Sequence, residues 1–173
     1  MKVEVVSVGY LEENCYIISK DNKCLVIDPG DEASKIIDKI DNKKVLAILI
    51  THNHFDHIGA VKELKDKYNV EVNDFNNLKE GTNSIDDFTF EVIYNPGHTK
   101  DSVSYYFKED NIMFVGDFVF EGTVGRCDLE GGSISEMKNS INKLKEHNED
   151  IVLYPGHGNS TTLNNEKMYN PYF

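Results

Sequence analysis

Three histidines and an aspartate lie within six consecutive residues, at His52, His54, Asp56 and His57. Imidazole and carboxylate side chains rarely fill a protein core, and both are ligands that zinc and similar divalent ions prefer. In an extended backbone alternate residues point the same way, so His52 and His54 can bind one metal ion. Asp56 continues on that side, whereas His57 has the opposite parity. A turn at the start of a helix must therefore bring Asp56 and His57 to a second ion.

Two metal ions need more ligands than this stretch supplies, and three later positions offer them. His98 and His157 each follow a Pro-Gly pair, a rigid turn that lets the backbone approach closely and aims the next side chain. Asp117 follows Gly116 at an expected strand end. A consistent assignment has one ion bound by His52, His54 and His98, a second ion bound by Asp56, His57 and His157, and Asp117 bridging both. A shared water would complete each site.

The elements around the cluster are predicted to be a buried strand and a helix. Residues Val45–Ile50 are continuously apolar, which is typical of a strand buried on both faces. After the cluster, apolar residues recur at helical spacing, at Ile58, Val61, Leu64 and Tyr68. The metal site is therefore expected where this strand ends and this helix begins.

Other segments have the apolar patterns of strands. They are Lys2–Val8, Cys15–Ile18, Lys23–Ile27, Phe88–Tyr94, Ser102–Phe107, Ile112–Val115 and Ile151–Leu153. The segment Val70–Asp87 is polar and rich in asparagine, with few apolar residues to anchor it. The strands fall into two groups that are each followed by helical segments. We therefore expect two sheets packed face to face, with helices outside.

Two further helices are predicted from their apolar stripes. The stripes are Ala33, Ile36, Ile37 and Ile40 in the first helix and Ile134, Met137, Ile141 and Leu144 in the second. Asp31 can cap the first helix, and a capping box formed by Ser133 and Glu136 opens the second. A terminal helical turn is expected near Thr161–Met168.

The composition bounds the class of protein. The 173-residue chain carries 18 basic and 30 acidic side chains, for a net charge of -12. Nucleic acids and anionic membranes are bound through clustered lysine and arginine, so this balance argues against both partners. Cys15, Cys24 and Cys127 are odd in number and have no CxxC spacing, which is typical of reduced thiols. With no long apolar run for a signal peptide or a membrane span, we expect one cytoplasmic domain over residues 1–173.

The order of the motifs resembles the metallo-β-lactamase superfamily. The HxHxDH box, the Pro-Gly-His-Thr turn, the Gly-Asp pair and the late Gly-His pair follow one another as in that superfamily, over nearly the whole chain. Within it, the chain is most similar to the small single-domain glyoxalase II-like hydrolases. The additional matches are Asn14-Cys15-Tyr16, Asp28-Pro29-Gly30, Gly125-Arg126-Cys127-Asp128-Leu129, Pro155-Gly156-His157-Gly158, and Glu166 with Asn170-Pro171-Tyr172.

This resemblance implies an α/β (α+β) fold, the four-layer αββα sandwich, with the metal ions in a cleft along one edge of the two sheets. It implies two divalent ions, zinc first, with iron or manganese accepted by the same ligands. Two ions roughly 3.5–4 Å apart lower the pKa of a shared water from about 15.7 toward about 7. Asp56 and Asp117 would hold the hydroxide that attacks a small-molecule thioester such as an S-acylglutathione. Asp28 would orient a ligand histidine.

Three departures from the family pattern bear on the substrate. True glyoxalase II enzymes bind glutathione with basic residues of a C-terminal helical domain, and this chain ends before such a domain. The interval between His57 and His98 is short, which predicts a trimmed lid or edge element and a more open pocket. Position 127 is Cys where the related motif usually has Thr. None of these departures changes a predicted metal ligand.

Other activities remain open. In the persulfide dioxygenase branch of the superfamily a single iron is held by two histidines and one aspartate, here His52, His98 and Asp117. Metal identity, metal count and oxygen consumption separate that activity from hydrolysis. Hydrolysis of another ester or a lactone is a further alternative, and so is a non-catalytic scaffold. A true β-lactamase is disfavoured because its better-known dizinc class has Cys in place of Asp117, and the acidic surface disfavours a nuclease.

Several of these residues also have plainer structural interpretations. The seven ligands could be buried hydrogen-bonded residues, although their joint pattern is specific to a metal site. Arg126 and Asp128 are interpreted as an ion pair that orders a loop, in preference to a substrate contact. The cysteines are interpreted as small apolar fillers, and His147 as a surface residue near a helix end. Pocket and core positions are equally open for Phe55, Phe118 and Phe120.

Overall fold

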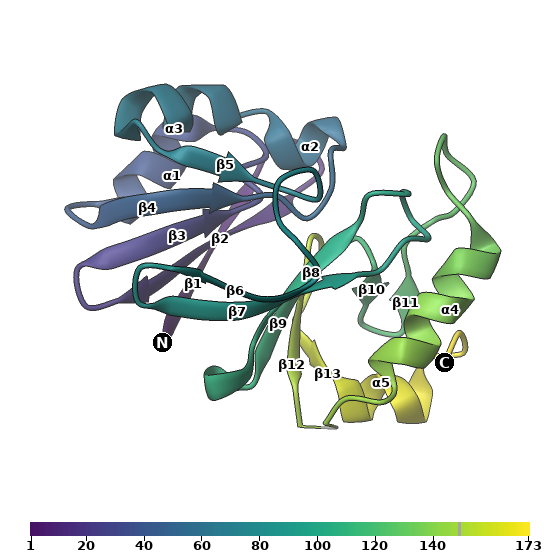
Figure 1. Cartoon of the computed structure of the whole chain (residues 1–173). Coiled ribbons are helices and arrows are strands. Elements are labelled where there is room, and N and C mark those ends of the chain that lie inside the picture. Colours follow the sequence, from purple (N-terminus) through teal and green to yellow (C-terminus); the bar gives the residue numbers. More distant parts are fainter. Residues whose placement is uncertain (149) are drawn as a thin grey trace.

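The first sheet contains the strand that precedes the histidine cluster. In the computed structural model, which describes residues 1–148 and 150–173, its strands lie in the order β1-β2-β3-β4-β5 (Figure 1). They are β1 (Lys2–Val8), β2 (Glu13–Lys20), β3 (Lys23–Ile27), β4 (Lys44–Leu49) and β5 (Glu71–Asn73). The first three strands pair antiparallel, whereas β3 with β4 and β4 with β5 pair in parallel. Parallel neighbours need a crossover connection.

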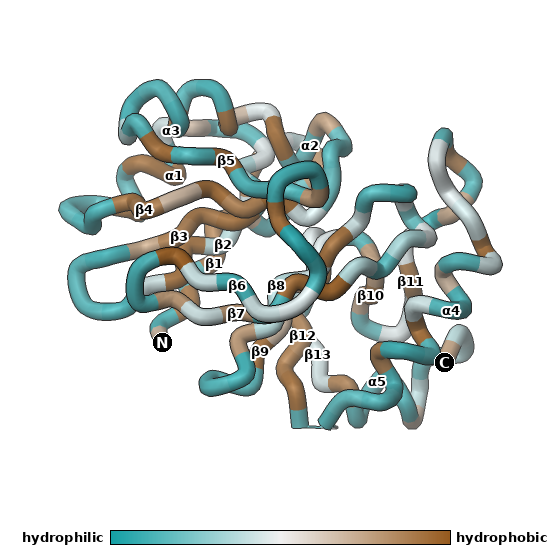
Figure 2. Tube along the Cα trace, in the orientation of Figure 1, coloured by the Kyte–Doolittle hydropathy of each residue, from teal (hydrophilic) through white to brown (hydrophobic). Residues whose placement is uncertain are grey.

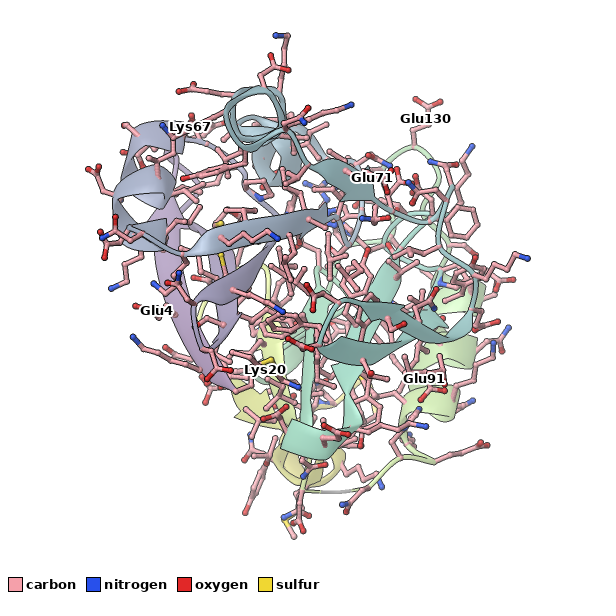
Figure 3. The ribbon with its side chains drawn as sticks, turned by 60° about the vertical axis from the view of Figure 1, so that its left-hand side comes forward. Glu4, Lys20, Lys67, Glu71, Glu91 and Glu130 are labelled. Atoms are coloured by element: carbon pink, nitrogen blue, oxygen red, sulfur yellow. The ribbon has the colours of Figure 1, made fainter. Side chains whose placement is uncertain are left out.

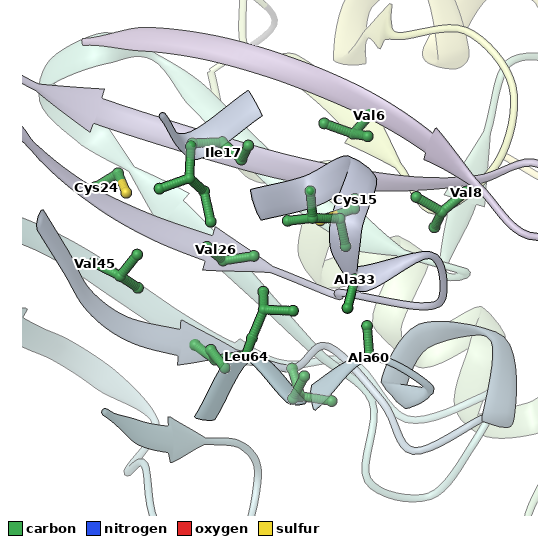
Figure 4. Packing of buried hydrophobic residues seen from close by; sticks show 14 residues of the cluster. Val6, Val8, Cys15, Ile17, Cys24, Val26, Ala33, Val45, Ala60 and Leu64 are labelled. Atoms are coloured by element: carbon green, nitrogen blue, oxygen red, sulfur yellow. The ribbon is translucent and has the colours of Figure 1, made fainter. Parts of the chain in front are cut away.

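Helices make these crossovers and cover the outer face of the first sheet. Helix α1 (Ala33–Ile40) connects β3 to β4, and α2 (Phe55–Ile58) and α3 (Val61–Tyr68) connect β4 to β5. Their apolar side chains meet those of the sheet in one buried cluster (Figure 4). The labelled members are Val6, Val8, Cys15, Ile17, Cys24, Val26, Ala33, Val45, Ala60 and Leu64.

The second sheet has the strand order β13-β12-β9-β8-β7-β6. Its strands are β6 (Gly81–Ile85), β7 (Phe88–Tyr94), β8 (Val103–Phe107), β9 (Ile112–Gly116), β12 (Val152–Pro155) and β13 (Thr161–Thr162). A short 3₁₀ turn, Lys108–Asp110, joins β8 to β9. Strands β9 and β12 are parallel, and between them in the chain lie the hairpin β10 (Val119–Phe120) with β11 (Thr123–Val124) and helix α4 (Ile134–Leu144). Helix α5 (Leu163–Tyr169) follows β13.

Strand β2 shows why two sheets can stack in this chain. Cys15 and Ile17 belong to the outer cluster, whereas Tyr16 and Ile18 belong to a second cluster that contains residues of both sheets. Side chains of a strand alternate between its faces, so this strand is buried on both. A third cluster joins the second sheet to α4 and α5. The layers are therefore helix, sheet, sheet and helix, as the sequence predicts.

Hydrophobic residues lie along the strands, and the outward turns of the helices and loops are hydrophilic (Figure 2). Charged side chains such as Lys67 and Glu130 project from the surface (Figure 3). Within residues 1–148 and 150–173, no helix combines the length and apolar character needed to cross a membrane.

The helix predicted after the histidine cluster is two helices, α2 and α3, with Gly59 and Ala60 between them. A Cβ at Gly59 would lie 2.2 Å from the carbonyl oxygen of Gly30. The amide of Ala60 donates to the carbonyl of Pro29 at 3.0 Å. The turn after β3 therefore contacts the chain at the position where α2 ends and α3 begins.

Two smaller predictions are wrong, and one polar segment holds strands. Asp31 does not cap α1, because its Oδ1 accepts from the amide of Glu32, which itself precedes the helix with a φ of 46°. Ile134 remains 66% exposed in the first turn of α4 instead of joining its apolar face. The segment 70–87 contains β5 and β6, which are edge strands and need less apolar surface than central ones.

Candidate metal centre

All seven predicted ligand side chains lie together at one end of the two sheets. The HxHxDH box follows β4 of the first sheet, and His98, Asp117 and His157 follow β7, β9 and β12 of the second. Strand ends of both sheets therefore supply the cluster. That each side chain binds a metal ion stays a prediction, and the geometry of the cluster tests whether the residues fit one.

The first group consists of His52, His54 and His98. The Nδ1 atom of His54 lies 3.2 Å from Nε2 of His52 and 2.9 Å from Nε2 of His98. Nδ1 of His98 donates to the carbonyl of Arg126 at 2.7 Å. Nδ1 of His52 lies 3.1 Å from the hydroxyl of Thr51, which is a donor to Asp28. These contacts assign the outer nitrogens as donors, so the Nε2 atoms of His52 and His98 face the group with lone pairs.

The second group consists of Asp56, His57 and His157. Nε2 of His157 lies 3.2 Å from Oδ2 of Asp56, and Nε2 of His57 lies 4.0 Å from the same oxygen. The outer nitrogens are again engaged, because Nδ1 of His57 donates to Asp28 at 3.0 Å and Nδ1 of His157 donates to the carbonyl of Leu11 at 3.1 Å. Asp28 thus orients His57, one of the proposed ligands.

Asp117 lies between the two groups. Its Oδ1 is 3.3 Å from Nε2 of His57, and its Oδ2 is 3.6 Å from Nε2 of His98 and 3.8 Å from Nε2 of His157. The carboxylate therefore contacts histidines of both groups. This is the position that the predicted bridging role requires.

Buried polar atoms without partners show that the residues fit divalent metal ions. Nε2 of His57 and Oδ1 of Asp117 are buried and have no hydrogen bond of acceptable geometry. Leaving such atoms unpaired is costly, whereas a cation would satisfy several inward lone pairs at once. Nitrogen and carboxylate oxygen in groups of three also match the donor set of zinc and related ions.

The electrostatics of the centre differ between the two groups. Burial lowers the pKa of His52 well below its usual value, and burial with nearby His98 lowers that of His54. Both rings are therefore neutral, the form that binds metal. Burial also disfavours the charged form of His57, but the nearby carboxylates of Asp117 and Asp28 outweigh it and raise its pKa well above its usual value. Despite burial, His57 lowers the pKa of Asp117 far below its ordinary range.

Glycines beside the ligands are needed for close approach. A Cβ at Gly156 would lie 2.4 Å from Oδ1 of Asp117, and one at Gly125 would lie 1.8 Å from the carbonyl oxygen of Asp117. Gly116 has a φ of +50°, and a Cβ there would lie 2.2 Å from the hydroxyl of Thr51. The glycines of these motifs therefore leave room for side chains of the centre.

The Asn14-Cys15-Tyr16 motif holds the loop that carries His157. The Asn14 amide donates to the carbonyls of Pro155 at 3.2 Å and Gly158 at 2.9 Å, and the hydroxyl of Tyr16 donates to Pro155 at 2.6 Å. Strand β12 and the loop that follows it are thereby tied to β2. The sequence indicated this motif only as a family resemblance, and the structure shows that it positions the loop that carries His157.

Glu13 and Thr51 are two residues near the centre whose role the sequence did not indicate. The Glu13 carboxyl is 1% exposed, lies 3.7 Å from Nδ1 of His57, and has no hydrogen-bond partner on either oxygen. Burial, with the charges of Asp28, Asp117 and Asp56, raises its pKa to about 10. Glu13 therefore contacts the centre as a neutral acid. Both residues lie among strand and turn positions that carry no distinctive spacing.

The remaining predicted residues take structural positions. Arg126 pairs with Asp128 through two bonds of 2.7 and 2.9 Å, the ion pair expected for this loop, and its carbonyl orients His98. His147 is partly exposed after α4 and stacks edge-on against Tyr106. Phe118 is buried in the third cluster, whereas Phe55 is 63% exposed beside the centre and Phe120 lies 6.2 Å from the ring of His157. Cys15 and Cys24 are buried in the outer cluster, and Cys127 packs against the third.

The arrangement agrees with a known family. The family model of the metallo-β-lactamase superfamily matches residues 8–73 and 69–157 of this sequence. The chain belongs to the metallo-β-lactamase superfamily. It is 34% identical to the probable metallo-hydrolase YqgX of Bacillus subtilis (strain 168), over 99% of this chain and 97% of the relative. It is also 34% identical to the hydroxyacylglutathione hydrolase GloC of Haemophilus influenzae, over 99% of this chain and 98% of the relative.

Solved structures of this superfamily have the same architecture. The BLEG-1 B3 metallo-β-lactamase superposes with a TM-score of 0.94 at 30% identity, covering 99% of both chains. TTHA1623 in a di-iron-bound form superposes with a TM-score of 0.91 at 31% identity, covering 99% of this chain and 100% of the other. The predicted metallo-β-lactamase fold is confirmed. Family membership supports a metal-dependent hydrolase, and the histidine and aspartate groups imply divalent metal ions.

Proposed function

We propose that this chain hydrolyses thioesters, with an S-acylglutathione as substrate. Its cofactors would be two divalent metal ions, with zinc as the preferred metal. The observation that carries the proposal is the meeting of two ligand groups at Asp117, whose oxygens lie 3.3 Å from His57 and 3.6 Å from His98. Its strongest outside support is the 34% identity to a hydroxyacylglutathione hydrolase over nearly the full length of both chains.

Each ion would have three ligands of its own and share the fourth. His52, His54 and His98 would hold one ion, Asp56, His57 and His157 the other, and Asp117 both. When bound, the ions would polarise the substrate carbonyl and lower the pKa of a nearby water toward neutrality. The same donors accept iron or manganese, so the choice of zinc is part of the proposal.

The protein's own groups orient the reactants. Asp117 stays ionised because of its low pKa and, with Asp56, accepts hydrogen bonds from the attacking water. Asp28 fixes His57 directly and His52 through Thr51, so the ligand rings are held before substrate binds. Water oxygen joins the carbonyl carbon, the carbon–sulfur bond breaks, and acid and thiol leave. The net charge of -12 favours a small-molecule substrate over a nucleic acid or an anionic membrane.

Hydrolysis of a β-lactam is a second candidate. It is favoured by the TM-score of 0.94 to the BLEG-1 B3 metallo-β-lactamase. The same water attack on a carbonyl would open a strained cyclic amide, and Asp117 disfavours only the dizinc class that has Cys at this position. The mononuclear persulfide dioxygenase alternative is less well supported, because four further ligand side chains lie beside His52, His98 and Asp117.

The deciding experiment compares substrates with one metal-loaded preparation. S-lactoylglutathione, a chromogenic cephalosporin, and glutathione persulfide with oxygen are offered in parallel, and metal per chain is measured by elemental analysis. We expect thioester turnover that a chelator abolishes, with two metal ions per chain. Turnover of the cephalosporin alone would reject thioester hydrolysis in favour of β-lactam hydrolysis. Oxygen consumption with one iron per chain would reject both hydrolases.

Substitutions link the activity to the centre. Loss of outer metal partners commonly costs about 10–100-fold, so Asp117→Asn, which removes a shared ligand, is expected to cost more than about 100-fold in kcat/KM. Asp38→Asn on the exposed face of α1 is the matched control and keeps full activity. An unaltered rate in Asp117→Asn would remove the bridging role.

A further inference from the structure

Two cavities adjoin the candidate metal centre, and their linings differ. The smaller one measures about 180 Å³ and lies between the β1–β2 turn, Gly30 and helix α2, with Asp56 in its wall. The larger one measures about 600 Å³ and has His54 in its wall. Each cavity therefore touches one of the proposed ligand groups. A substrate whose carbonyl lies at the centre would extend into both.

The smaller cavity carries exposed hydrophobic side chains. Tyr10, Leu11 and Phe55 are 81%, 42% and 63% exposed. Large apolar side chains gathered at one exposed place on a soluble domain indicate contact with a ligand or partner. The carbonyl of Leu11 accepts from His157 at 3.1 Å, and Phe55 lies between His54 and Asp56 in the chain. Leu11 and Phe55 are therefore next to residues of both proposed ligand groups. We name this cavity the acyl pocket.

Its volume limits the group that it accepts. A cavity of about 150 Å³ in a protein core is known to hold one benzene molecule. The acyl pocket, at about 180 Å³, therefore admits a group of about six carbons. Asp31 and Asp56 also line it, and Asp56 belongs to the proposed metal centre. Val8, Leu11 and Phe55 are among the apolar residues of its lining.

The larger cavity is lined mostly by polar and charged residues, with charges of both signs. Lys100, Asp101 and Glu130 line it, and the amide of Asn53 donates to Asp101 at 3.1 Å. Glu130 projects at the tip of its loop (Figure 3). A peptide thiol such as glutathione carries an ammonium group and carboxylates, which match such a mixed lining. The volume lies within the usual range of about 300–1,000 Å³ for small-molecule sites.

We propose that the acyl pocket binds an apolar acyl group of up to about six carbons, while the larger cavity binds the thiol carrier. The inference rests on the proposed thioester hydrolysis and adds the class of acyl group and the direction in which the substrate lies. Medium-chain aliphatic or phenyl-substituted acyl thioesters are then better substrates than the hydrophilic lactoyl thioester.

The test is a series of S-acylglutathiones with lactoyl, acetyl, butanoyl, hexanoyl and decanoyl groups. Burial of one methylene corresponds to about a fourfold gain, and the pocket is partly open, so we expect at least a tenfold rise in kcat/KM from acetyl to hexanoyl. The rise should stop at decanoyl, which exceeds the pocket. Lactoyl should fall near acetyl.

Variants locate the preference. Phe55→Ser and Tyr10→Ser should flatten the series, lowering hexanoyl turnover at least fivefold more than acetyl turnover. Phe55 is next to two ligands, so metal per chain is measured for each variant, and Tyr10→Ser provides a change away from them. Tyr169→Ser, which removes a 74% exposed side chain on α5, is the matched control and keeps the preference.

The outcomes separate the two levels of the proposal. A hexanoyl preference lost in Phe55→Ser and Tyr10→Ser supports it. Turnover of the series with lactoyl preferred, or with a preference untouched by both variants, overturns the acyl assignment and leaves thioester hydrolysis standing. Absence of turnover for every member in a fully metal-loaded sample overturns both.

Discussion

Gly156 lies so close to Asp117 that a Cβ at position 156 would lie 2.4 Å from the Oδ1 atom of Asp117 and 2.5 Å from Cε1 of His57. Its φ is not in the left-handed region, so the requirement for glycine is space and not backbone conformation. Gly156, which precedes the proposed ligand His157, thus leaves the space that Asp117 and His57 occupy.

Gly156→Ala is therefore expected to displace Asp117 and His57 and to reduce metal from two ions toward one per chain, with loss of most activity. Elemental analysis after dialysis measures the metal. Gly158→Ala is the control in the same loop, because a Cβ there meets nothing within 4 Å, although its φ of +75° makes it mildly strained. Equal metal loss in both variants would point to loop strain in place of a clash at the centre.

The hydroxyl of Thr51 gives a second prediction. It donates to Asp28 at 2.6 Å and lies 3.1 Å from Nδ1 of His52. Asp28 therefore orients the His52 ring through this hydroxyl, which acts as a relay. Thr51→Val removes the relay and should weaken metal binding about 10–100-fold. Competition with a chromogenic chelator measures the affinity. Thr51→Ser keeps the hydroxyl and should stay close to the parent, and a similar loss in both variants would contradict the relay.

Metal binding should release protons. The folded, metal-free protein holds His57 with a pKa well above its usual value, so this ring is protonated at pH 7. A ligand nitrogen must be deprotonated, so loading the centre displaces that proton, and the affinity for metal falls as the pH falls. Calorimetric titrations in two buffers with different ionisation enthalpies give the proton count. We expect about one proton from His57 per chain, and none in His57→Gln.

The buried Glu166 should matter for stability. Its carboxylate is 0% exposed and accepts from Thr161 at 2.6 Å, Asn170 at 2.8 Å and the amide of Gly122 at 3.0 Å. Glu166→Ala leaves these donors without a partner and should cost about 3 kcal/mol in the free energy of unfolding. Urea unfolding of chelated protein measures it. Glu146→Ala, on an exposed position, should change stability by less than about 0.5 kcal/mol.

Much of the architecture could be predicted because the strands carry strong local patterns. Segments Lys2–Val8, Lys23–Ile27 and Phe88–Tyr94 were predicted with the bounds that the structure has. Strands β5 and β6 were not, because edge strands are held by ladder hydrogen bonds and need no continuous apolar pattern. The break between α2 and α3 also depends on a distant turn at Gly30, which local spacing does not encode.

The candidate centre follows the same rule. The seven proposed ligands can be predicted from the sequence because their residue types and turn signals are unusual. Glu13 and Thr51 were missed because they act through contacts with residues far along the chain or through a neighbour's ring. The acyl pocket was missed for the same reason, since Tyr10 and Phe55 line one cavity only when the β1–β2 turn and α2 are in place.

The proposed ligands come from both sheets of the sandwich. His52, His54, Asp56 and His57 follow a strand of the first sheet, whereas His98, Asp117 and His157 follow strands of the second. Each ion would therefore fasten one half of the molecule to the other, as a cross-link does. An ion present at about 100 times its Kd would add about 2.7 kcal/mol to the free energy of unfolding. The supply of metal would then help to set the fraction of the protein that is folded, and chelation would remove the connection between the two sheets at this edge.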